Sequence, residues 1–178
     1  MPHAQLKNVR GAASGAAALL ILSAGLAGAQ TKISGESNCK APEAVGAAEV
    51  GDRAGHAIVL LKFACTWTTP MEMAGQKTKD VTAIQIEDTS GGKGQFRGYI
   101  VVMMDNGDKA FGRFSGTDTT KPDHSGTAEG PWSFTGGTGK LKGLKGKGTV
   151  KTTIAADGTA TDHIEGEYSL PASKPAKK

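Results

Sequence analysis

The stretch QFRGYIVVMMDNGDKAFGRFSGT, residues 95–117, contains two runs typical of β-strands joined by a tight turn. Asn106-Gly107 at its centre is among the strongest short signals for a β-hairpin, because both central residues of that turn need a positive φ. The runs on either side are rich in aromatic, β-branched and other apolar residues, as strands are. This stretch therefore predicts an antiparallel hairpin.

The same pattern recurs along the chain. Ala156-Asp157-Gly158-Thr159 predicts a second tight hairpin, and Ser90–Gly94 predicts a looser turn made of glycines. Between such turns lie eight candidate strands: Thr31–Ser34, His56–Trp67, Asp80–Asp88, Gln95–Met104, Lys109–Thr117, His124–Phe134, Lys147–Ile154 and Thr161–Leu170. Evidence for helices is poor: only Ala41–Val50 could hold a short helical turn, and its Pro and Gly argue against even that.

Serial hairpins without a long crossover leave two architectures, an up-and-down barrel and a sandwich. Glycines inside strands favour the barrel, because closure needs bulges and tight bends at such positions. These glycines are Gly112, Gly116, Gly126, Gly130 and Gly166. The predicted fold is an all-β, eight-stranded antiparallel up-and-down β-barrel, with the sandwich as the alternative.

The chain ends differ in composition from the rest. Lys7 and Arg10 precede an apolar run over residues 16–26, and Ala27-Gly28-Ala29 supplies small residues for cleavage before Gln30. This layout is typical of a secretory signal peptide, and the run is shorter than the roughly 20 residues of a membrane span. No Cys follows at position 29 to accept a lipid. We expect a cleaved signal peptide over residues 1–29, one barrel domain over 30–170 and a flexible basic tail over 171–178.

Export places the protein in a periplasmic or secreted compartment, where disulfides persist. Cys39 and Cys65 are the only two cysteines of the 178-residue chain, and no C-x-x-C spacing suggests redox or metal chemistry. A structural Cys39–Cys65 disulfide is therefore expected. In the chain-entropy model, closing this loop stabilises the fold by roughly 3.5 kcal/mol.

A glycine-rich segment carries a family resemblance. WSFTGGTGKLKGLKGKG, residues 132–148, resembles the Gly-Gly-Thr-Gly-Lys-Phe motif and basic strand of dirigent proteins, which share a barrel superfamily with allene oxide cyclases. Small exported bacterial proteins of unassigned function are similar here and in IEGEYSLP, residues 164–171. The resemblance implies an eight-stranded antiparallel barrel that could hold a pocket. It implies no reaction, because the pocket residues of those families lie outside the matched segment.

The candidate ligand site depends on which strand face is interior. If the face of Phe111, Arg113 and Ser115 is interior, Arg113 needs an acidic partner or an anionic ligand, and Glu129 on the next strand could serve. The alternative is that Arg113 faces solvent while Phe114 packs inward. The candidate ligand-binding residues are Arg97, Tyr99, Arg113, Glu129 and Trp132. Small barrels hold one ligand or are filled by side chains, and both interiors remain open here.

Cofactor and metal motifs are missing from the sequence. His124 and His163 lack a second His at ligand spacing, and Met71-Glu72-Met73 offers two sulfurs without a neighbouring His. We therefore expect no metal and no cofactor, and the sequence indicates no catalytic residue. The formal net charge of +4 falls to +2 without residues 1–29, too little for a nucleic-acid partner.

Three functions fit these observations. The favoured one is a non-enzymatic exported protein without a stable membrane anchor. It binds a small molecule that is apolar, amphiphilic or anionic. The second is a cofactor-free isomerase or cyclase acting in the barrel, which needs Arg113 and Glu129 to point inward. The third is a structural or surface-interaction protein with a filled barrel. The oligomeric state is left open.

Overall fold

The computed structural model describes residues 30–172, in which antiparallel strands follow one another in chain order. The signal peptide predicted for 1–29 and most of the tail predicted for 171–178 lie outside the described residues. The elements are β1 (Thr31–Cys39), β2 (Glu43–Glu49), β3 (Ala57–Thr69), β4 (Glu72–Met73), β5 (Gln76–Ser90), β6 (Lys93–Met104), β7 (Lys109–Thr120), β8 (Gly126–Gly137), the 3₁₀ turn η1 (Gly139–Leu141), β9 (Lys145–Ile154) and β10 (Ala160–Ser169).

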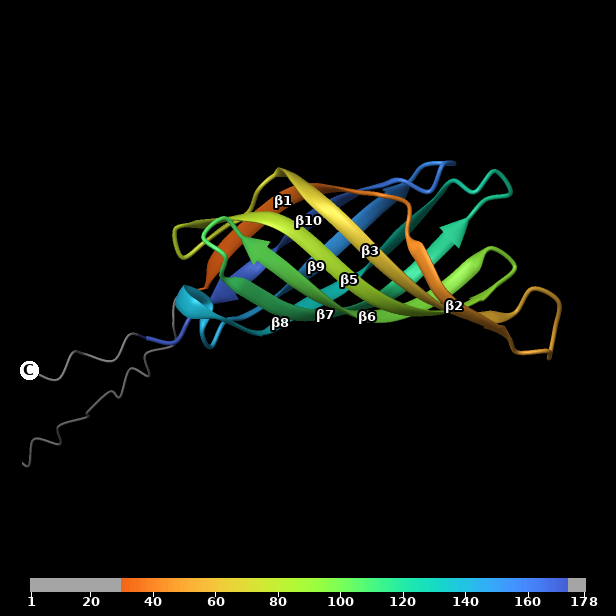
Figure 1. Ribbon diagram of the computed structural model, residues 1–178, viewed down its shortest axis with the longest axis horizontal. Coiled ribbons are helices and arrows are strands. Elements are labelled where there is room, and N and C mark those ends of the chain that lie inside the picture. The colour runs from red at the N-terminus through yellow and green to blue at the C-terminus, as the bar shows by residue number, and fades with distance from the viewer. Residues whose placement is uncertain (1–29, 173–178) are drawn as a thin grey trace, which may run out of the picture.

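Eight of these strands close into a barrel (Figure 1). From β5 to β10 each strand pairs with the next, β3 pairs with β5, and β1 pairs with both β10 and β3. The predicted eight-stranded antiparallel barrel is therefore confirmed, and the sandwich alternative is wrong. Each of the eight predicted strands overlaps one barrel strand.

The two predicted tight hairpins are also present. Gly107 lies between β6 and β7 with φ 87°, and Gly158 lies between β9 and β10 with φ 82°. These are left-handed backbone conformations that glycine adopts without steric cost.

Residues Ala41–Val50 hold no helical turn, as their Pro and Gly predicted. Residues Glu43–Glu49 form β2, which pairs antiparallel with the first half of β3, from Glu43 opposite Lys62 to Glu49 opposite Ala57. β1 leaves this half of β3 unpaired, because it pairs with β3 only between Thr69 and Cys65. β2 therefore pairs with backbone groups of β3 that would otherwise be left at a free strand edge.

The interior divides into two halves along the barrel axis. At the end that carries η1, Met73, Met104, Leu141 and Leu144 are fully buried members of the hydrophobic core. This end lies at the left of Figure 1, and the hairpin turns after β5, β7 and β9 lie at the right. The half nearer those turns, called here the hairpin end, is less completely filled. Among residues 30–172, no helix is long and apolar enough to cross a membrane.

Candidate ligand cavity

A cavity of about 370 Å³ lies inside the barrel, between the buried core and the hairpin end. Its wall comes from the inward-facing residues of all eight barrel strands, and most of them are apolar, including Leu61, Phe63, Phe96, Phe114, Trp132 and Ile164. Lys40, Pro42, Thr120 and Gly158, at strand ends and in connections, form its rim at the hairpin end. A cavity of this size and lining is typical of small-molecule sites.

Glycines opposite aromatic rings leave this space open. Phe114 Cζ lies 2.6 Å from where Gly98 would carry a Cβ, and Phe96 Cζ lies 2.5 Å from the same position on Gly116. Each ring therefore lies over its cross-strand glycine, in space that a side chain would otherwise occupy. The two rings also contact each other, with centroids 6.0 Å apart. Side chains at these glycines would push the rings into the cavity.

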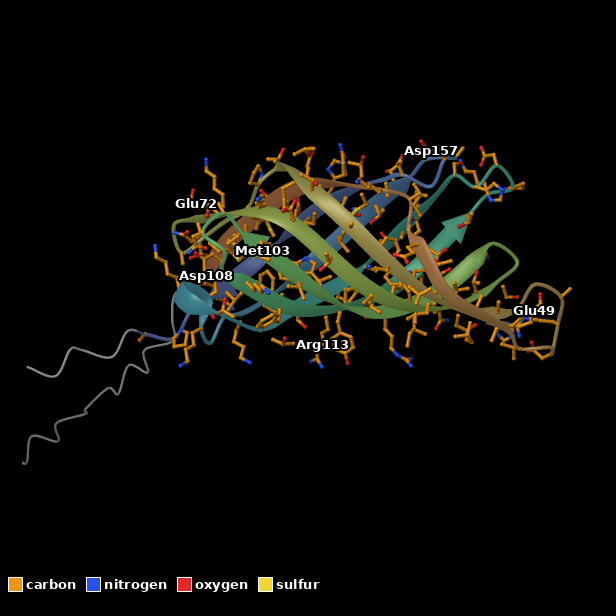
Figure 2. All side chains as sticks on the ribbon, viewed as in Figure 1. Glu49, Glu72, Met103, Asp108, Arg113 and Asp157 are labelled. Atoms are coloured by element: carbon orange, nitrogen blue, oxygen red, sulfur yellow. A yellow bond between two sulfur atoms is a disulfide. The ribbon has the colours of Figure 1, made fainter. Side chains whose placement is uncertain are left out.

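The five predicted site residues do not gather at this cavity. Arg97, Tyr99, Arg113 and Glu129 are exposed on the outer face, and Figure 2 shows Arg113 projecting from the outside of the barrel wall. Trp132 is interior and lines the cavity, where its Nε1 donates a hydrogen bond to the Thr149 carbonyl at 3.2 Å.

The face interpretation with Arg113 inside is therefore wrong, and the alternative with Phe114 inside is confirmed. Arg113 lies opposite Tyr99, and Glu129 lies opposite Thr117 and Lys151, so Arg113 and Glu129 do not pair. The physical reason is desolvation, because burying an unpaired guanidinium in the barrel costs far more free energy than burying Phe114 and small residues.

Two carboxyl groups lie near the cavity mouth. Glu87 of β5 and Asp118 of β7 both line the cavity, on either side of β6. A Cβ on Gly94 of β6 would collide with both Asp118 Oδ1 and Glu87 Oε1, so the two groups face each other above that glycine. Gln85 Nε2 donates to Glu87 Oε2 at 2.9 Å.

Burial dominates the electrostatics of this carboxyl pair. Desolvation raises the pKa of Glu87, and the neighbouring Asp118 charge raises it further. Desolvation likewise raises the pKa of Asp118. Asp118 Oδ1 is buried and has no hydrogen-bond partner in the part of the chain that the structure describes. Within residues 30–172, no nitrogen of Lys, Arg or His lies within 4.0 Å of either carboxyl. The pair therefore has no compensating positive charge.

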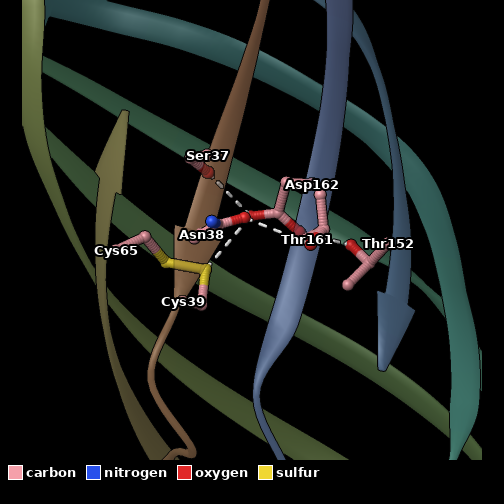
Figure 3. The surroundings of a disulfide bond; sticks show 7 residues. All are labelled: Ser37, Asn38, Cys39, Cys65, Thr152, Thr161 and Asp162. Atoms are coloured by element: carbon pink, nitrogen blue, oxygen red, sulfur yellow. Dashed lines mark hydrogen bonds between the residues drawn. A yellow bond between two sulfur atoms is a disulfide. The ribbon is translucent and has the colours of Figure 1, made fainter. Parts of the chain in front are cut away.

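A third carboxyl, Asp162 of β10, lines the cavity beside the disulfide (Figure 3). Ser37 Oγ donates to Asp162 Oδ2 at 3.2 Å, and Thr152 Oγ1 donates to Oδ1 at 2.6 Å. Oδ2 also lies 3.3 Å from Cys39 Sγ. Desolvation raises the pKa of Asp162 in spite of these hydrogen bonds.

The predicted Cys39–Cys65 disulfide is present, and it joins directly opposed residues of β1 and β3. With Asp162, the two sulfurs form a group whose potential ligand atoms lie within 4.8 Å of one another. The disulfide removes both thiolates from this group, so only the carboxylate retains ordinary affinity for a metal ion.

Sequence reasoning missed the three cavity carboxyls and Trp67. Trp67 lines the cavity at 9% exposure, and its Nε1 has no hydrogen-bond partner among the described residues. The signal was present in β7: Phe114 and Asp118 share the face of Gly112 and Gly116. A prediction that this face is interior would also have placed Asp118 inside the barrel.

No protein-family model matches this chain, and no curated protein matches it. Among solved structures, the chain is similar to a protein of unknown function from the DUF3224 family of Shewanella oneidensis MR-1. The two are 18% identical, the match covers 81% of this chain and 100% of that one, and the TM-score is 0.46. Because that protein has no known function, the likeness assigns no activity.

Proposed function

We propose that this protein binds a small, largely apolar molecule inside its barrel. The observation that carries the proposal is the cavity of about 370 Å³, which has an apolar wall and a few polar groups. Each buried CH₂ group of a ligand would contribute about 0.8 kcal/mol. The unpartnered Trp67 Nε1 supports an occupant as well, because a buried donor without an acceptor costs free energy that a ligand oxygen could recover.

The proposal includes the compartment and the relationship to known barrels. The Cys39–Cys65 disulfide supports an exported protein, released by cleavage before Gln30 into the periplasm or the medium. The closed eight-stranded barrel supports kinship with the dirigent and allene oxide cyclase group. We propose neither a nucleic-acid partner nor a stable membrane anchor, in keeping with the low net charge and the short apolar run of the leader.

A cofactor-free isomerase or cyclase is the second candidate, and one observation favours it. Glu87, Asp118 and Asp162 line an apolar cavity with raised pKa values, as general acids often do. In this second candidate function, these three carboxyls take the catalytic role that the sequence had suggested for Arg113 and Glu129, which lie on the outer face. The bound molecule would then be recovered chemically rearranged.

Native mass spectrometry of protein exported by its own leader tests the proposal. We expect a mature chain beginning at Gln30, two hydrogens lighter for the disulfide, with an added mass that leaves on denaturation. Ala83 is buried and lines the cavity, so Ala83→Phe should fill that space and lower occupancy about ten-fold or more.

Ala64→Phe is the matched control. Ala64 lies on the neighbouring strand β3, opposite Thr82, and faces outward. This variant should keep wild-type occupancy. Protein without an adduct that also fails to take up any added apolar compound would contradict the proposal.

A further inference from the structure

The distribution of charge inside the cavity indicates which chemical class of ligand it accepts. The cavity lining contains three acidic residues, Glu87, Asp118 and Asp162, and each of them is partly buried. The one basic residue in the lining, Lys40, is exposed at the rim. With its carboxyls ionised, the cavity is therefore negative. A ligand carboxylate would meet repulsion there, whereas a cation would be attracted.

We propose that the ligand is a small amphiphile with a protonated amine, whose cationic end binds between Glu87 and Asp118 while its apolar part fills the barrel. This inference rests on the proposed function, because it assigns a ligand class to the same cavity. It departs from the anionic ligand that the sequence suggested, which depended on an inward Arg113.

The geometry of the mouth suits an ammonium group. The two carboxyls face each other above Gly94, where the absence of a side chain leaves them room. An ammonium group has three hydrogen-bond donors, enough to reach both carboxyls at once. Among residues 30–172, Asp118 Oδ1 has no hydrogen-bond donor, so a ligand N–H that reaches it would satisfy an unpaired buried group.

The next interior positions suit a cation with an apolar body. Phe96 follows Gly94 by two residues on β6, and Phe114 precedes Asp118 by four on β7, so both rings lie deeper on the same interior face. Aromatic faces attract cations as well as hydrocarbon. Deeper still, Trp67 at 9% exposure offers an unpartnered N–H to an oxygen elsewhere on the ligand. A ligand oxygen bound to this donor would satisfy a buried group that has no acceptor among residues 30–172.

Three probes with one hydrocarbon chain test this inference: octylamine, octan-1-ol and octanoate. Both tryptophans of the chain, Trp67 and Trp132, line the cavity, so intrinsic fluorescence should report binding directly. Near neutral pH, octylamine should bind about ten-fold or more tightly than octan-1-ol, and octanoate should bind most weakly. Below the raised pKa values of the mouth carboxyls, the preference for the amine should disappear, because both groups are then neutral.

Isosteric variants test whether the two mouth carboxyls cause the preference for the amine. In Glu87→Gln/Asp118→Asn, affinities for the amine and the alcohol should come within about two-fold of each other, with the affinity for the alcohol unchanged. Glu129→Gln, on the exposed outer face, should keep the full preference. If the double variant fails to fold, Asp118→Asn alone should reduce the preference, and thermal melting checks that each variant is folded.

The outcomes separate this inference from the proposed function. Equal binding of the three probes, or tightest binding of octanoate, would overturn the amine assignment and leave a ligand-binding barrel. A preference for the amine that survives in the folded double variant would also overturn it, because attraction would then come from elsewhere on the surface. Binding of none of the probes, together with no native adduct, would overturn the proposed function itself.

Discussion

At the scale of single residues, His56 shows how a buried polar group is satisfied at the hairpin end. Its side chain is almost fully buried, and both ring nitrogens contact carboxylates: Nδ1 contacts Asp52 and Nε2 lies 2.9 Å from Asp88. The hydrogen bond to Asp52 is the main cause of the raised pKa of His56, and Asp88 adds to it. The same contact lowers the pKa of Asp52. The connection between β2 and β3 is thereby held against β5.

Stability should depend on pH through this group. A raised pKa in the folded state means that His56 contributes its full stabilisation below its ordinary pKa of 6.5 and loses it as the pH rises through the raised value. Asp52 contributes above its ordinary pKa of 3.8 and loses its contribution as the pH falls through the lowered value. The contact is therefore strongest under mildly acidic conditions.

Thermal melting of the wild type and of His56→Gln measures this effect. The wild type should exceed the variant in melting temperature by more at about pH 5.5 than at about pH 9. A difference that does not change with pH would show that the imidazole charge adds nothing to stability.

At the scale of elements, the Trp132 indole of β8 packs across glycines of β9 and β10. Trp132 Cζ2 lies 2.5 Å from where Gly148 would carry a Cβ, and equally close to that position on Gly166. The three residues are neighbours across three strands, since Trp132 lies opposite Gly148 and Gly148 lies opposite Gly166. The indole thus covers two glycines at once and forms part of the cavity wall.

Gly148→Ala should destabilise the barrel by roughly 1–3 kcal/mol, because the added methyl group collides with the Glu165 carbonyl as well as with the indole. Gly136→Ala is the matched control on β8, since nothing lies within 4 Å of its added Cβ. The control should be close to neutral in chemical denaturation. Equal losses in the two variants would mean that general strand propensity, rather than this packing, requires the glycine.

At the scale of the whole molecule, barrel closure depends on a short junction between β1 and β3. This ladder has four register pairs, ending at Cys39 opposite Cys65, and a register shift interrupts it between Glu36 and Ser37. The ladder between β9 and β10, in contrast, has ten. The disulfide therefore reinforces the ladder that has the fewest register pairs of any in the barrel.

Removal of the disulfide in Cys39→Ala/Cys65→Ala should lower the free energy of unfolding by roughly 3.5 kcal/mol. The backbone amides of the junction between β1 and β3 should then exchange hydrogen faster than those between β9 and β10. Ligand binding should weaken as well, because both sulfurs belong to the cavity wall. Wild-type stability in the folded double variant would contradict this role in closure.

Local sequence by itself determined the eight barrel strands, the tight turns, the disulfide and the barrel class, but not the short strands β2 and β4. Asn106-Gly107 and Asp157-Gly158 encode turns through backbone sterics, and two cysteines allow one pairing, so neither result needs distant contacts. Only the tertiary structure decided which strand face is interior. The alternation of side chains along a strand allows either face to be the interior one. Once the eight strands form a closed barrel, burial favours the face of Phe114 over that of Arg113. The cavity and the meeting of Glu87 with Asp118 above Gly94 follow from that choice, because those residues are adjacent only across paired strands.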